Sequence, residues 1–293
     1  MVEVLRGSVA QAALAVARTS RNAVEKGYDP AVWPEPFWSG GQTRLLVWRE
    51  PHSGLDVHFQ AMLVEPIARR ATSAARTRLP LVVFFGGVGS SGGLVEAKAV
   101  AMRRVVPGPF VLVAPLRQKG MAWWVLTGAG DWGWVDGDFD RERVHRLSAW
   151  IHHLAQHPGI NGDWLTFLGY SAGAYAATEI FASGVVRARS LVLGGVHGHG
   201  QPDIENLDEK RVRRRGEITT KWEAFLARIA QHNGATGGIY GTHNHEDNVC
   251  PWKHAEIIFQ VLSRRQEQLG LPAASLEQIS IPWTGKKKAK SVH

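Results

Sequence analysis

The sequence predicts an α/β fold in which a mostly parallel central sheet carries helices on both faces. Three observations support this fold class. A pair of strand-like runs joined by a turn lies near the start, short continuous apolar runs follow it, and strand and helix patterns then alternate along the chain. Such alternation is typical of parallel sheets, because a parallel crossover needs a helix to return the chain.

The first two strands are expected at residues 44–50 and 55–64, with Pro-His-Ser-Gly at residues 51–54 as the turn of an antiparallel hairpin. The apolar run at residues 81–85 does not alternate with polar residues, which is typical of a strand buried on both faces. Further strands are expected at residues 110–114, 164–168, 191–193, 238–240 and 276–281, and helices at 93–105, 140–156, 172–182, 221–231 and 253–269.

The chain has 293 residues, of which 44% are hydrophobic and 20% charged, and this is enough for one packed core. We expect an α/β domain over residues 41–293, preceded by an accessory segment over residues 1–40. Residues 200–220 carry several arginines and are a candidate for a small lid.

The formal net charge of +8 comes mainly from basic clusters at residues 211–215 and 286–290. Neither cluster is interleaved with aromatic residues, so no nucleic-acid partner is expected. No apolar run reaches the roughly 18 residues that a membrane span needs. The single cysteine, Cys250, fits a reducing compartment, so a cytoplasmic location is expected, with a weak N-terminal targeting signal as the alternative. The oligomeric state is not indicated.

The most informative motif is Gly169-Tyr170-Ser171-Ala172-Gly173, a G-x-S-x-G sequence between an apolar strand and an alanine-rich helix. In this context the serine is expected on a sharp turn with its hydroxyl above the sheet. The two glycines leave room for neighbouring backbone, and the helix directs its N-terminal amides toward the serine. Ser171 is therefore the predicted nucleophile.

A glycine-rich loop, residues 86–93, follows the strand at residues 81–85. Backbone amides of such a loop can approach a developing negative charge, so the amides of Gly87 and Ala172 are the predicted oxyanion hole. A phosphate-binding loop is disfavoured, because Leu94 stands where that motif needs a lysine.

These residues resemble the α/β-hydrolase superfamily. Within it they are most similar to the esterase and predicted-peptidase group related to polyhydroxyalkanoate depolymerases and feruloyl-type esterases. The resemblance runs from Leu79 to the C-terminus and rests on L-P-L-V-V-F-F-G-G-V-G-S-S-G and I-N-G-D-W-L-T-F-L-G-Y-S-A-G-A-Y-A-A. One departure is Phe85-Gly86, where family members often have His-Gly. The resemblance implies a serine hydrolase that acts on a small-molecule ester or acyl substrate without a cofactor.

In the superfamily the catalytic acid and then the histidine follow the serine in the chain. Asp247 begins a D-x-V-x-P sequence that resembles the family's acid loop, and Glu246 beside it is the alternative acid. His293 is the histidine that follows the last expected strand and is the predicted base, with His197 or His199 as fallback. The residues expected to line the substrate pocket are Val88, Tyr170, His197, His199, Trp132 and Trp252.

Two other functions stay open at the level of the sequence. His243, His245 and Asp247 match most of an H-x-H-x-D-H metal motif, although Asn248 stands at its sixth position, so a metal-dependent hydrolase is one alternative. The other is a hydrolase-fold protein that binds a ligand without turning it over, because fold alone does not guarantee activity.

Overall fold

A computed structural model of the chain describes residues 38, 42–51, 56–65, 78–87, 94–104, 106–115, 141–196, 222–245, 247 and 251–280. The predicted lid at residues 200–220 lies outside these residues, as does the predicted accessory segment apart from Trp38.

The described residues form an eight-stranded sheet in the order β1-β2-β4-β3-β5-β6-β7-β8. Strand β2 pairs antiparallel with β1 and with β4, and the other neighbours are parallel. The predicted hairpin and the mostly parallel sheet are therefore confirmed. The strands are β1 (Arg44–Arg49), β2 (Asp56–Val64), β3 (Leu79–Phe85), β4 (Phe110–Pro115), β5 (Ile160–Tyr170), β6 (Ser190–Gly194), β7 (Ile239–Asn244) and β8 (Ser275–Ile279).

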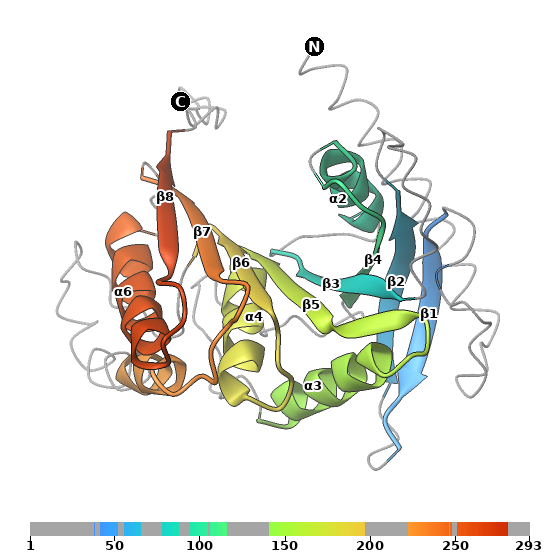
Figure 1. The fold of residues 1–293 in the computed structure, drawn as a ribbon, viewed down its shortest axis with the longest axis horizontal. Helices are drawn as coiled ribbons and strands as arrows, with labels where there is room; N and C mark the ends of the chain where they lie inside the picture. Colours follow the sequence, from blue (N-terminus) through green and yellow to red (C-terminus); the bar gives the residue numbers. More distant parts are fainter. Residues whose placement is uncertain are drawn as a thin grey trace, which may run out of the picture.

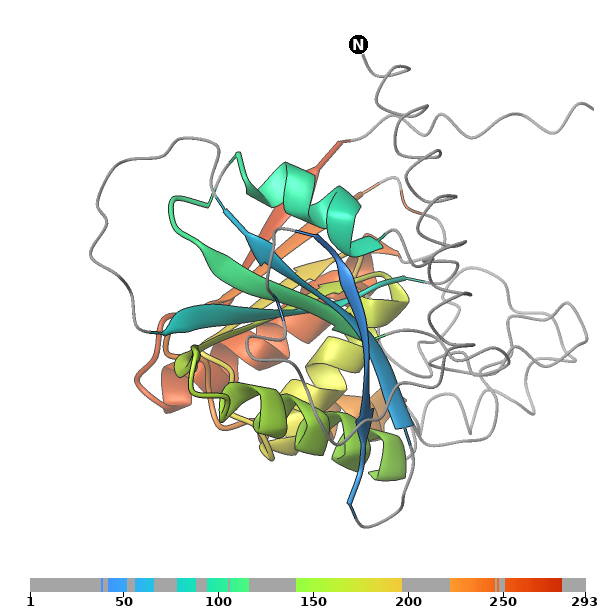
Figure 2. The same cartoon turned by 90° about the vertical axis from the view of Figure 1, so that its right-hand side faces the viewer.

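Helices lie on both faces of this sheet (Figure 1). Helix α2 (Leu94–Met102) covers one face near β2 and β4, and α3 (Arg141–Ala155), α4 (Ala172–Ser183) and α6 (Trp252–Gln268) lie on the opposite face. The turned view in Figure 2 shows α2 and α3 on opposite sides of the strands. Residues 222–229 are also helical. Among the described residues no helix combines the length and apolar character that a membrane crossing requires.

Strand β3 is buried on both faces because it contributes to two separate hydrophobic cores. Val82 and Phe84 pack with α2, whereas Val83 and Phe85 belong to the larger core with α3 and α4. This explains the unbroken apolar run that predicts the strand.

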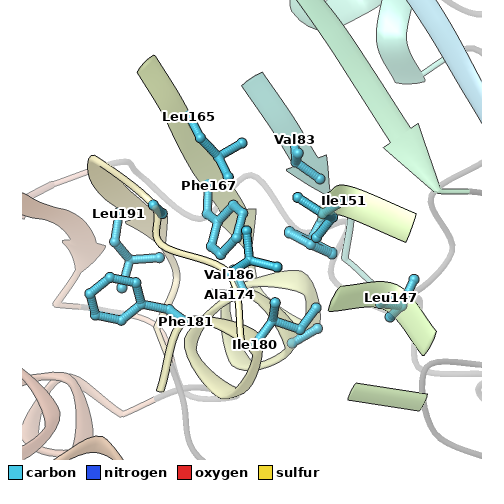
Figure 3. Packing of buried hydrophobic residues seen from close by; sticks show 14 of the residues in the cluster. Val83, Leu147, Ile151, Leu165, Phe167, Ala174, Ile180, Phe181, Val186 and Leu191 are labelled. Atoms are coloured by element: carbon cyan, nitrogen blue, oxygen red, sulfur yellow. The ribbon is translucent and has the colours of Figure 1, made fainter. Parts of the chain in front are cut away.

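Figure 3 shows the larger core around α4. Leu147 and Ile151 of α3 and Ala174, Ile180 and Phe181 of α4 approach side chains of the sheet, which are Val83, Leu165, Phe167 and Leu191. These side chains are buried, so the helix that follows Ser171 is fixed against the sheet by close-packed apolar contacts.

Strands β5 and β7 extend furthest beyond their predicted bounds. Strand β5 begins at Ile160, where it pairs with Leu79, and its register then shifts before Leu81 pairs with Leu165. Strand β7 continues from the expected end at Tyr240 to Asn244, because Thr242 pairs with Gly194 of β6 and Asn244 with Ile279 of β8. Pairing on both sides overrides the polar, loop-like composition of this segment.

His232 lies between the helix at residues 222–229 and β7, and its side chain is 0% exposed. Its Nδ1 accepts a hydrogen bond from the Gly234 N–H at 2.8 Å, and its ring centroid is 4.9 Å from that of Phe181. Burial lowers the pKa of His232 to about 4, and the nearby charge of Arg265 also lowers it. The folded protein therefore disfavours protonation of this ring.

This pKa predicts a loss of stability in mild acid. The unfolded chain takes up a proton on His232 below about pH 6.5, whereas the folded chain does so only near pH 4. The contribution is therefore fully present above pH 6.5 and is lost as the pH falls, by about 2 kcal/mol between pH 7.5 and 5.0. We expect His232→Asn to remove this part of the pH dependence, because an amide can still accept from Gly234 but does not titrate. Urea unfolding at the two pH values measures the difference, and an unchanged dependence in the variant would contradict the assignment.

Candidate active site

Ser171 occupies a sharp turn between β5 and α4 with φ 52° and ψ −123°. It is the one non-glycine residue with positive φ among those the structure describes. Its N–H donates to the Gly194 carbonyl at 2.7 Å, and its own carbonyl accepts from the Ala174 N–H at 2.8 Å. Its hydroxyl does not cap the helix. The backbone of Ser171 is therefore in a strained conformation, and its hydroxyl forms no capping hydrogen bond with α4.

The two glycines of the motif are required by close contacts between backbones. A β-carbon on Gly169 would lie 2.6 Å from the Ala174 Cα. A β-carbon on Gly173 would overlap the Phe85 carbonyl group. Backbone atoms cannot move aside as a flexible side chain can, so any larger residue at these positions would push α4 away from the strands.

Gly87 follows β3 and lies beside the turn. A β-carbon placed on Gly87 would be 3.1 Å from the Ser171 Cβ. Ala172 is the first residue of α4 and is buried. The structure thus brings Gly87, Ser171 and Ala172 together at the start of α4, where the helix dipole has its positive end.

Hydrogen bonds connect the carboxyl ends of the strands from the Ser171 turn to β8. Ser171 donates to Gly194 after β5, and Gly195 after β6 donates to the Thr242 carbonyl at 3.1 Å. After β7, the His245 N–H donates to the Ile279 carbonyl at 3.3 Å. The segments that follow β5, β6, β7 and β8 therefore begin at one edge of the sheet.

Asp247 lies in the turn that follows β7, where its N–H donates to the Asn244 carbonyl at 3.0 Å. Asp247 is half-buried. This turn starts beside the end of β8, so the predicted acid and the segment that carries the predicted base leave the sheet next to each other. Glu246 and His293 themselves lie outside the described residues.

His243 and His245 take different places from those a shared metal site would need. His243 is the fifth residue of β7 and is fully buried, and its Nδ1 accepts a hydrogen bond from the Val196 N–H at 3.0 Å. His245 is exposed beyond the strand. Within the described part of the chain, no group of three or more His, Cys, Asp or Glu side chains could hold a metal ion.

Of the predicted pocket residues, Tyr170 and Trp252 are described and Val88, Trp132, His197 and His199 are not. Tyr170 is 55% exposed, and the Lys98 Nζ of α2 lies 5.7 Å from its ring centroid. Its ring is therefore on the α2 side of the sheet. Trp252 begins α6, and its ring centroid is 5.9 Å from that of His243. This contact with a buried strand residue gives Trp252 a packing role that its place in the sequence does not indicate.

Neither a protein-family model nor a curated protein matches the sequence. Solved structures do match. A lipase/esterase from Lactobacillus plantarum is 13% identical with a TM-score of 0.54, and the match covers 82% of this chain and 90% of that chain. An esterase from Thermogutta terrifontis, solved with butyrate bound, is 13% identical with a TM-score of 0.52, and covers 85% and 86%.

Longer proteins match over only part of their length. The chain spans 55% of a thermostable esterase (15% identity, TM-score 0.50, 82% of this chain). It spans 32% of dipeptidyl peptidase 4 from Porphyromonas gingivalis (12% identity, TM-score 0.51, 83% of this chain). These likenesses show that the chain has the α/β-hydrolase fold predicted from its sequence.

The contact of Gly173 with β3 predicts the effect of the smallest possible substitution. We expect Gly173→Ala to lower the free energy of unfolding by about 1–3 kcal/mol, because its methyl group meets the Phe85 backbone. Urea unfolding followed by circular dichroism measures this loss. Ala182→Ser, near the other end of α4, is the control and should stay within about 0.5 kcal/mol of the wild type. Equal stability of the two variants would show that α4 does not depend on this contact.

Proposed function

We propose that the protein is a serine hydrolase that cleaves carboxylic esters through an acyl-enzyme on Ser171. The observation that carries the proposal is the positive-φ conformation of Ser171 at the junction of β5 and α4, with Gly87 alongside. A residue held in this sparsely populated region needs the surrounding structure to maintain it, and such strain is concentrated at functional sites. The α/β-hydrolase fold supports the same reaction class.

The proposed reaction has two steps. His293 accepts the Ser171 hydroxyl proton as the Oγ attacks the carbonyl carbon, and the tetrahedral intermediate expels the alcohol, which takes that proton from the histidine. A water molecule, deprotonated by the same histidine, then attacks the carbonyl carbon of the acyl-enzyme. The second tetrahedral intermediate breaks its bond to the Ser171 Oγ, which takes the proton back from the histidine, and the acid is released. Asp247, or Glu246 in its place, would hold the imidazole in the required tautomer and stabilise its charged form.

The amides of Gly87 and Ala172 would hold the oxyanion in both steps. Their support is the closeness of Gly87 to Ser171 and the place of Ala172 at the start of α4. Removal of one such donor typically slows catalysis about 10²- to 10³-fold.

Carboxylic esters are the proposed substrate class because esterases are among the solved structures that share the fold. The esterases from Lactobacillus plantarum and Thermogutta terrifontis match at TM-scores of 0.54 and 0.52, and the second was solved with butyrate bound. Dipeptidyl peptidase 4 and an acylaminoacyl peptidase share the fold as well, so peptide hydrolysis is the alternative reaction. A small-molecule ester is the proposed substrate, and the reaction as written uses no cofactor.

We expect a fluorophosphonate probe to label Ser171, as identified by mass spectrometry of the tryptic peptides. Ser171→Ala should abolish the label, and His293→Ala should slow labelling by at least about 10³-fold, because the hydroxyl then lacks its base. Of Asp247→Asn and Glu246→Gln, the variant that slows labelling about 10⁴-fold identifies the acid. Thr178→Ser, one helical turn beyond the motif, is the control and should label as the wild type does.

An unlabelled Ser171 in folded protein would overturn the proposal. Hydrolysis of p-nitrophenyl butyrate that persists without labelling and disappears on treatment with a chelator would then indicate the metal-dependent alternative. Ligand binding without turnover would indicate the non-catalytic one.

A further inference from the structure

His243 is a buried histidine that the reaction proposed above does not use. It belongs to the face of β7 that includes Ile239 and Gly241 and is directed toward α6, and it is 0% exposed. A backbone N–H can only donate, so the hydrogen bond from Val196 requires a lone pair on the His243 Nδ1. The Nδ1 of His243 is therefore the acceptor in this bond.

The hydrogen bond to Val196 begins where regular pairing of β6 with β7 ends. The last backbone pair of the two strands joins Gly194 to Thr242. Val196 is two residues further on and is itself buried, so its N–H needs an acceptor that is not water. The His243 side chain supplies this acceptor. It continues the connection between the two strands past the end of their backbone pairing.

Two hydrogen bonds relate His243 to Ser171, the proposed nucleophile. His243 binds Val196, and Gly194, two residues before Val196, accepts the hydrogen bond from the Ser171 N–H. The ring of His243 also contacts the ring of Trp252, the first residue of α6, with an angle of 66° between the ring planes. Both candidate acids, Glu246 and Asp247, lie in the chain between His243 and Trp252. His243 thus directly precedes the segment that carries the candidate acids, contacts Trp252 after that segment, and binds Val196, which follows β6.

We propose that His243 is a positioning residue that fixes the end of β7 and the start of α6, between which both candidate acids lie in the chain, relative to Ser171. The proposal rests on the serine-hydrolase function proposed above. A misplacement of catalytic groups by about 1 Å costs on the order of 10²-fold in rate. A residue that fixes their relative position should therefore affect kcat more than KM.

The test compares two substitutions of His243 with the same two at His232. His243→Leu replaces the ring with an apolar side chain of similar size that offers no acceptor to the Val196 N–H. In His243→Asn the amide oxygen can accept that hydrogen bond. His232 is the matched control, because it is equally buried and its Nδ1 also accepts a backbone N–H bond, from Gly234. It precedes β7, at the opposite edge of the parallel strands from Ser171.

With p-nitrophenyl butyrate as substrate, we expect His243→Leu to lower kcat about 10- to 100-fold with KM within about twofold of the wild type. His243→Asn should recover kcat to within about threefold. His232→Leu should lose thermal stability but keep kcat within about twofold. Hydrogen exchange of the Val196 amide should be at least tenfold faster in His243→Leu than in the wild type, and slow again in His243→Asn.

Three results would overturn the positioning role: wild-type kcat in folded His243→Leu, an equal fall of kcat in His232→Leu, or no recovery in His243→Asn although the Val196 amide is again protected. If fluorophosphonate does not label Ser171 of the wild type, the proposed function fails and the positioning role fails with it. The exchange of the Val196 amide does not depend on activity, so it still reports whether His243 forms the structural bond. The two failures are therefore distinguishable.

Discussion

Helix α4 approaches the ends of β3 and β5 so closely that neither Gly169 nor Gly173 has room for a β-carbon. This contact brings the first amides of the helix beside Gly87 and forces the chain to reverse at a single residue, Ser171. A positive φ at a non-glycine residue costs on the order of 1–3 kcal/mol. The cost is offset by the hydrogen bonds of Ser171 with Gly194 and Ala174 and by the burial of the apolar side chains of α4. The positive-φ conformation of Ser171 is thus a consequence of helix packing.

Hydrogen bonds at the end of β6 connect the Ser171 turn to β7. The end of β6 accepts the Ser171 N–H on one side and donates, through Gly195 and Val196, to the end of β7 on the other. Strand β7 in turn pairs with β8 and binds Ile279 through the His245 N–H. A displacement of β6 would therefore change the distance between Ser171 and the turn after β7 that carries Asp247. Because β6 lies between β5 and β7, this short strand of five residues joins the Ser171 turn to the strand that precedes Asp247.

The sequence predicts those parts of this arrangement that depend on local sterics or on burial. Gly169 predicts the turn because its contact with Ala174 lies within the strand-turn-helix unit itself, whereas the contact of Gly173 is with Phe85 of the neighbouring strand β3. The apolar run of β3 predicts a strand buried on both faces. Strand β7 past Tyr240 is not predictable in this way, because its polar residues form a strand only through pairing with β6 and β8. The partner of His243 is 47 residues away in the chain, and no local pattern indicates it. In the sequence His243 instead suggests a metal ligand, because spacing alone does not distinguish a ligand from a buried acceptor. The choice between Asp247 and Glu246 also depends on side-chain direction, which neighbouring positions in a sequence do not specify.

Esterases and peptidases share this fold with the present chain at 12–15% identity, because burial pattern and a few backbone contacts are enough to maintain it. The two reactions nevertheless place different demands on the site. A peptide's amine leaves only if the histidine delivers a proton to it, so the imidazole must be well aligned with the leaving group as well as with the serine. An alkoxide leaving group is a weaker base than an amide anion, so ester cleavage tolerates a less exact alignment. In an enzyme of this fold, the ratio of esterase to amidase activity therefore depends on how exactly the serine and the histidine are aligned. In this chain, hydrogen bonds join the Ser171 turn to the end of β6, β6 to β7, and the turn after β7 to the end of β8.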